Sequence, residues 1–164
     1  MHRPLDPRIV NVTLDANAFD RQGGPEDAQV DRLLELWNSE QIRLVVPASV
    51  RTETLNPRTP ASIRDLILQQ IHTLTVEQSP GERDLYLRVR EILQGNATPG
   101  KHDSDARHVV EAAKYGGYFI THDRRIHVTK RDELEAILPT SFWIVTLAEF
   151  LQIYDQYTEA RHEK

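Results

Sequence analysis

The stretch DSDARHVVEAAKYGGYFITHD, residues 103–123, predicts a helix, a turn and a strand in direct succession. Apolar side chains recur in its first half at helical spacing, and two consecutive glycines end the helix. The apolar run YFIT that follows is typical of a buried strand. Such a helix runs antiparallel to the strand it leads into, so the helix begins at the edge where the strand finishes. Asp105 and Asp123 are therefore expected at the same edge of a sheet.

Apolar runs on both sides of this unit predict the rest of the sheet. Three further strands are expected at residues 8–14, 43–47 and 142–145, and residues 73–77 form either a short strand or a connection. Amphipathic helices are expected near residues 30–37, 61–71, 81–94, 103–115 and 131–138, and after the capping box Thr146-x-x-Glu149. Strands that alternate with helices predict an α/β fold: a three-layer α/β/α sandwich around a mostly parallel central sheet of four to five strands.

Length and composition indicate an ordinary globular protein. The 164 residues are expected to form a single domain, residues 1–164, with a polar tail that frays from about residue 158. No cysteine is present, which excludes disulfides and thiolate metal sites. No apolar run approaches the roughly 20 residues needed to cross a membrane, and the N-terminal residues lack the apolar stretch of a signal peptide. A cytoplasmic location without membrane contact is therefore expected.

Four acidic residues stand where a parallel sheet would gather them: Asp15, Glu53, Asp105 and Asp123. Asp15 and Asp123 follow strands directly, and Glu53 comes six residues after Pro47, which ends the strand at 43–47. Ligands of such sheets bind outside the carboxyl ends of the strands. Four carboxylates this close would repel one another unless cations were present, and Mg²⁺ or Mn²⁺ prefers oxygen ligands. The pattern predicts a metal site suited to phosphodiester hydrolysis.

Alternative interpretations remain open for individual members of this set. Asp105 is also an ordinary first-turn acid favoured by the helix dipole, and Asp103 is either the cap of the same helix or the ligand in its place. Zinc is not favoured, since the histidines at 102, 108, 122 and 127 lack the HExxH pattern. His108 lies three residues beyond Asp105 on the same helix face. One interpretation is that it contacts the substrate or a group that supports the ligands. The other, which is favoured, is that its side chain lies at the surface.

The charge of the chain limits how it would contact nucleic acid. A net charge of −5 argues against a protein that coats RNA or DNA by charge neutralisation. It does not argue against a nuclease, because bound cations reverse the charge of a carboxylate pocket. Four basic residues flank the acids and are candidates to hold RNA phosphates, although each alone is a common surface charge: Arg51, Arg107, Arg124 and Arg125. The large aromatic residues Trp37, Tyr118, Phe142 and Trp143 fall on apolar faces and are expected in the core.

Taken together, the pieces VTLDAN, VPASVRTE, DARHVVEAAKYGGYFITHD and IVTLAEFL resemble the PIN-domain ribonucleases, from about residue 9 to residue 152. The resemblance implies Mg²⁺- or Mn²⁺-dependent cleavage of RNA on an α/β/α sandwich. By position, Asp15, Glu53, Asp105 and Asp123 match the acidic quartet of that family. Asn17 and Thr121 match the small polar residues that support the quartet by hydrogen bonding.

Many small members of that family resemble VapC-type toxins, which implies a possible antitoxin partner. This chain is longer than those toxins, chiefly between residues 77 and 101. Dimers are plausible for a small domain of this kind, so a homodimer is a further expectation.

The leading hypothesis is a metal-dependent endoribonuclease in which Asp15, Asp105 and Asp123 hold the metal and Glu53 completes the site or orients water. A catalytically inactive scaffold that binds RNA or protein is the alternative. A phosphatase with Asp15 as nucleophile ranks lower, because Asn17 stands where such enzymes have a second acid.

Overall fold

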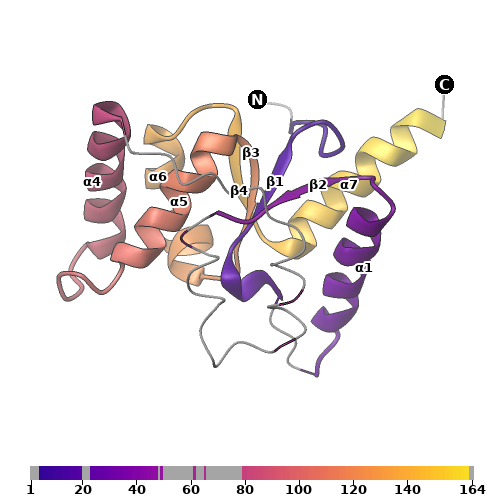
Figure 1. Ribbon diagram of the computed structural model, residues 1–164, viewed down its shortest axis with the longest axis horizontal. Helices are drawn as coiled ribbons and strands as arrows, with labels where there is room; N and C mark the ends of the chain where they lie inside the picture. The colour runs from indigo at the N-terminus through magenta and orange to yellow at the C-terminus, as the bar shows by residue number, and fades with distance from the viewer. Residues whose placement is uncertain are drawn as a thin grey trace.

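A four-stranded sheet with the order β2–β1–β3–β4 forms the centre of the protein (Figure 1). The computed structural model describes residues 4–19, 23–47, 49, 61, 65 and 79–162. The strands are β1 (Asn11–Leu14), β2 (Arg43–Val45), β3 (Gly117–Ile120) and β4 (Phe142–Val145). All three pairings between neighbouring strands are parallel. The carboxyl ends of the four strands therefore point to the same edge of the sheet.

Helices lie on both faces of this sheet (Figure 1). Helices α1 (Glu26–Asn38) and α7 (Leu147–His162) contribute to the hydrophobic cluster on one face. Helices α4 (Pro80–Gln94), α5 (Asp103–Tyr115) and α6 (Arg131–Ile137) contribute to the cluster on the other. Two short helical segments, the 3-10 helix Ala16–Phe19 and the π-helix Arg125–Thr129, follow β1 and β3. The fold is therefore α/β with a parallel sheet, and it is compatible with the expected three-layer sandwich.

Alternation along the strands decides which side chains face which helices. In β1, Val12 and Leu14 belong to the cluster formed with α1 and α7. Thr13 and Asp15 consequently point to the opposite face, where α5 lies. In β3, Tyr118 packs with α1 and α7, whereas Phe119 packs with α4, α5 and α6. A carboxylate one residue beyond β1 is thus directed toward α5.

The sequence-based boundaries agree well with the structure where the signals are local. The expected helix over 103–115 and the expected strand over 142–145 have those bounds in the structure. The capping box is confirmed, since Glu149 N donates to Thr146 Oγ1 at 3.2 Å and Thr146 N donates to the Glu149 carboxylate at 3.3 Å. The predictions of a helix over 61–71 and of a strand or connection over 73–77 fall mostly or wholly outside the described residues.

One expectation needs correction. The first strand begins at Asn11 and not at residue 8, because Arg8 is engaged in a local turn with Asp6, whose carboxylate accepts from Arg8 N at 3.0 Å. In the polar tail from about residue 158, which is expected to fray, the described residues as far as His162 belong to α7. The hydroxyl of Tyr157 donates to the carbonyl of Pro4, which fastens this last part of the helix to the N-terminal segment. Within the described residues, no helix combines the length and apolar character that a membrane span requires.

Tyr118 gives the fold a predicted sensitivity to alkaline pH. Its buried ring packs edge-on against Phe150, and its hydroxyl donates to the carbonyl of Leu5 at 2.5 Å. Burial raises the pKa of this phenol well above its ordinary value of 10.0. Because the pKa of Tyr118 is higher in the folded than in the unfolded protein, its contribution to stability is fully present below the pKa of the unfolded state. This contribution is lost as the pH rises above about 10.

We therefore expect the free energy of unfolding of the wild type to fall above about pH 10 more steeply than that of Tyr118→Phe. At neutral pH the variant should lose only about 1 kcal/mol, the worth of one hydrogen bond. Urea denaturation of both proteins at neutral and alkaline pH measures the difference. Parallel pH profiles for the two proteins would contradict this prediction.

Candidate carboxylate site

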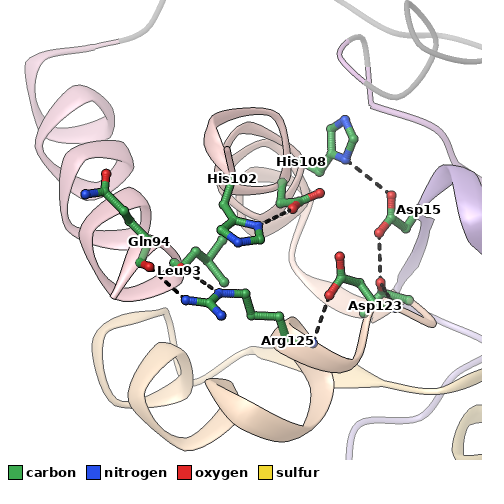
Figure 2. A network of polar contacts seen from close by, with 9 residues as sticks. Asp15, Leu93, Gln94, His102, His108, Asp123 and Arg125 are labelled. Atoms are coloured by element: carbon green, nitrogen blue, oxygen red, sulfur yellow. Dashed lines mark hydrogen bonds and ion pairs between the residues drawn. The ribbon is translucent and has the colours of Figure 1, made fainter. Parts of the chain in front are cut away.

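Asp15 is the centre of a polar network at the carboxyl edge of the sheet (Figure 2). It is only 4% exposed and directly follows β1. The register pairs Leu14 with Ile120, so Asp15 lies beside Thr121. The Asp15 amide donates to the carbonyl of Ile120 at 3.0 Å, and the Thr121 hydroxyl donates to Oδ2 of Asp15 at 2.8 Å. The strand register thus produces the side-chain contact.

Thr121 links Asp15 to a second acid. Its Oγ1 accepts a hydrogen bond from the amide of Asp123 at 3.1 Å, and its own amide donates to Val145 of β4 at 3.1 Å. Oδ1 of Asp123 accepts from the amide of Arg125 at 2.8 Å, within the turn that opens the π-helix. One buried hydroxyl therefore organises the segments that carry two carboxylates.

Asn17 fastens the same region from the other side. Its Oδ1 accepts a hydrogen bond from the amide of His122 at 3.0 Å. This contact joins the 3-10 helix after β1 to the loop after β3, which carries Asp123. Thr121 thus bonds the Asp15 carboxylate itself, whereas Asn17 bonds only the backbone of the neighbouring loop.

The third acid reaches this edge from α5. The helix packs its small residues Ala106 and Ala113 and the larger Val109 into the core, which lets its backbone approach the sheet. Asp105 lies in the first turn, where the helix dipole favours a carboxylate. Oδ2 of Asp105 lies 3.1 Å from Nδ1 of His102, the residue that precedes the helix.

Electrostatic interaction links Asp105 to the other two carboxylates. Burial raises the pKa of Asp105 above its ordinary value of 3.8. The imidazole of His102 opposes this increase, and the negative charges of Asp123 and Asp15 add to it. The charges of Asp15, which follows β1, and of Asp123, which follows β3, thus act on Asp105 of α5 across the edge of the sheet.

The structure distinguishes the two acids at the start of α5. Asp103 lies 3.5 Å from the guanidinium of Arg90 on α4, in a half-exposed ion pair. Asp105, by contrast, is coupled to Asp15 and Asp123. Of the two alternatives left open by the sequence, Asp105 is therefore the one that belongs to the cluster.

His108 is placed differently from the sequence-based expectation. The sequence favours a surface orientation for this residue, and that prediction is wrong, because His108 is only 1% exposed. Its Nδ1 lies 3.2 Å from Oδ1 of Asp15 (Figure 2). His102, which the sequence presents only as a possible zinc ligand, contacts Asp105, and the spacing of three residues between them is the signal for that contact.

The candidate phosphate-binding residues divide into three groups. Arg107 and Arg124 are exposed beside the acids. The guanidinium of Arg125 instead donates to the backbone carbonyls of Leu93 and Gln94, the latter at 2.8 Å, at the carboxyl end of α4 (Figure 2). Arg51, like the fourth predicted acid Glu53, lies outside the described residues.

A metal fits the chemistry of these donors but is not enclosed by them. In the described part of the chain, no group of three or more histidine, aspartate or glutamate side chains is arranged to hold a metal ion. Comparison of the chain with known protein families, curated proteins and solved structures finds no match. The functional conclusion therefore depends on the geometry and on the residues themselves.

The coupling of the carboxylates predicts a measurable effect of Asp15→Asn on Asp105. Because the charge of Asp15 raises the pKa of Asp105, its removal should lower that pKa. The pKa should remain above the ordinary value, since burial is the largest cause of the increase. Carbon-13 NMR titration of the side-chain carboxyls measures the shift in the metal-free protein. Asp103→Asn is the matched control and should leave it unchanged; an unaltered Asp105 pKa in Asp15→Asn would contradict the coupling.

Proposed function

We propose that this protein is a divalent-metal-dependent endoribonuclease that hydrolyses RNA phosphodiester bonds. Asp15, Asp105 and Asp123 would hold Mg²⁺ or Mn²⁺, and Glu53 would complete the site. The observation that carries the proposal is the position of Asp15 and Asp123 at the carboxyl edge of a parallel sheet, where one Thr121 hydroxyl links them, with Asp105 close enough for their charges to add to the effect of burial on its pKa. Ligand sites of open α/β sheets occur at this edge.

The donors suit a hard cation with a partly hydrated coordination shell. Mg²⁺ usually keeps several waters and binds through one or two carboxylates together with substrate phosphates. A site of this kind does not require three protein side chains to enclose the ion. The repulsion that raises the pKa of Asp105 is what a cation between these groups would relieve. The hydrogen bond from Thr121 to Asp15 provides the outer support that ligating carboxylates commonly have.

The position of Ser49 supports the inclusion of Glu53. Both the amide and the hydroxyl of Ser49 donate to Oε2 of Glu111 on α5, at 3.0 Å and 2.5 Å. The chain after β2 is thereby fastened to the helix that carries Asp105. Glu53 follows this anchor by only four residues in the sequence. A role for it in orienting the attacking water is part of the proposal.

The proposed reaction is attack of water on phosphorus, in line with the bond that breaks. A cation bound here would lower the pKa of water and offset the charge that develops on the phosphate. Rupture of the bond between phosphorus and the 3′ oxygen leaves a 3′-hydroxyl on one fragment and a 5′-phosphate on the other. The exposed Arg107 and Arg124 would hold neighbouring phosphates. The buried Thr121 keeps Asp15 and the Asp123 segment in place during the reaction.

The test is cleavage of fluorescently labelled single-stranded and hairpin RNAs with Mn²⁺, with Mg²⁺ and with excess EDTA. We expect metal-dependent cleavage, and fragments that carry 5′-phosphate and 3′-hydroxyl ends. Asp105→Asn should abolish it, whereas Asp103→Asn, a matched change two residues away on the same helix, should retain it. Cleavage that survives EDTA, or equal loss in the two variants, would refute the proposed site.

A second candidate is a scaffold of the same fold that binds RNA or a protein without cutting. The observation in its favour is that the described side chains alone do not form a group of three suited to metal. Calorimetric titration with Mn²⁺ separates the two candidates. Saturable binding that Asp15→Asn removes supports the nuclease, and RNA binding without any Mn²⁺ binding supports the scaffold.

If the protein is a nuclease of the toxin type that the sequence resembles, a short neighbouring reading frame should encode its antitoxin. Co-expression of the two proteins should then relieve growth arrest caused by this chain, and Asp15→Asn should cause no arrest. Size-exclusion chromatography with light scattering would test the expected homodimer.

A further inference from the structure

His108 is a buried polar side chain directly beside the carboxylate cluster. It is 1% exposed and lies on the inward face of α5, next to the buried Val109 and Ala112. An imidazole in such surroundings loses its hydrogen bonds to water, so its burial is costly unless protein groups replace them. Its Nδ1 atom lies 3.2 Å from Oδ1 of Asp15 (Figure 2). The carboxylate therefore offsets part of the cost of burying the ring.

The two oxygens of Asp15 are contacted from two different elements. Thr121, at the end of β3, donates to Oδ2 at 2.8 Å, and His108, on α5, lies against Oδ1. The terminal torsion of an aspartate is broad, so the carboxylate would otherwise rotate freely about its Cβ–Cγ bond. Contacts on both oxygens restrict this rotation and leave the remaining lone pairs in a defined direction.

We propose that His108 is a positioning residue that holds the Asp15 carboxylate in the orientation that binds a divalent cation. The inference rests on the proposed function and adds a residue to its machinery. Loss of an outer hydrogen-bonding partner commonly weakens metal binding about 10–100-fold. An imidazole suits the position because its Nδ1 lies against Oδ1 of Asp15 without a fixed positive charge, whereas lysine or arginine would compete with the cation.

A matched pair of substitutions tests this role. In His108→Asn the amide nitrogen branches from Cγ as Nδ1 does, so a polar group facing Asp15 is kept. In His108→Leu the branched shape is kept and the polar group is lost. Calorimetric titration of the full-length proteins with Mn²⁺ should show affinity weakened about 10–100-fold by the Leu variant and largely retained by the Asn variant. Higher Mn²⁺ concentrations should restore RNA cleavage by the Leu variant, which a purely structural defect would not allow.

A double substitution shows whether the effect passes through Asp15. In the Asp15→Asn background, His108→Leu should not weaken the remaining Mn²⁺ affinity further, because the group it positions has been removed. Thermal unfolding identifies any variant that fails to fold.

Three outcomes would overturn the inference. A folded Leu variant that binds Mn²⁺ as tightly as the wild type would exclude the positioning role while leaving the proposed function intact. An Asn variant as weak as the Leu variant would exclude a role through the polar contact of Nδ1 with Asp15. A wild type that binds no Mn²⁺ would refute the proposed function, and this inference with it.

Discussion

Replacement of Asp15 by Asn is expected to lower the rate of Mn²⁺-dependent RNA cleavage by about 10²–10⁴-fold, the loss of several kcal/mol of transition-state stabilisation. The fold should remain intact, because the carbonyl of asparagine can still accept the hydrogen bond from Thr121. Its amide would then face His108, whose ring can accept in its other tautomer. Initial rates at saturating Mn²⁺, together with circular dichroism, measure both parts of the prediction.

The control for this substitution is Asp103→Asn, which removes a carboxylate of the same helix as Asp105 but outside the cluster. It should cleave RNA at close to the wild-type rate. Full Mn²⁺-dependent activity of Asp15→Asn would eliminate the mechanism. Loss of activity accompanied by unfolding would instead show that Asp15 is needed for the fold.

Replacement of Gly117 by Ala should cause the largest loss of stability. The residue opens β3 with a φ of +77°, and a Cβ atom there would lie 2.1 Å from the carbonyl oxygen of Asn11 in β1. Relief of this contact requires movement of backbone in the strand that leads to Asp15. The positive φ costs about 1–2 kcal/mol and the overpacking about 1–3 kcal/mol more. Equilibrium urea denaturation should therefore show destabilisation of about 3 kcal/mol or more.

Gly116 provides the matched control for this clash. Its φ is also positive, +67°, but the nearest atom to an added Cβ is the carbonyl oxygen of Ser141 at 3.8 Å, an ordinary contact. Gly116→Ala should therefore cost only the strain of a backbone conformation that glycine alone adopts readily, about 1–3 kcal/mol. Equal costs at the two positions would contradict the close approach of β1 and β3. That approach sets the register which places Asp15 beside Thr121.

The sequence predicts those parts of the fold whose signals are local. The bounds of α5 follow from its apolar periodicity and from the glycines after it, and the start of α7 follows from its capping box. The expectation that Asp15, Asp105 and Asp123 gather at one edge follows from the positions of two of them at the ends of parallel strands and of Asp105 at the start of the helix that leads into β3. Each of these features depends on residues close together in the sequence or on the general topology of α/β sheets.

Contacts between distant segments could not be predicted in this way. Nothing near Arg125 in the sequence indicates that its guanidinium binds Gln94, 31 residues earlier, because the partner is a backbone carbonyl. The same applies to Tyr157, whose hydroxyl reaches Pro4 across 153 residues and extends α7. His108 is a related case, since a histidine on a helix face gives no indication of burial until the packing of that face is known. The supporting contacts of the site are therefore harder to predict than its acids.

The most direct test of the central claim is the position of a bound metal ion. Crystals of the protein grown with Mn²⁺ and measured at a wavelength with anomalous scattering from manganese would locate it. We predict an anomalous peak within coordinating distance of at least two of the carboxylates of Asp15, Asp105 and Asp123, and its loss in crystals of Asp15→Asn. A fully soaked crystal with no peak at this edge of the sheet, or with manganese bound only elsewhere, would contradict the account.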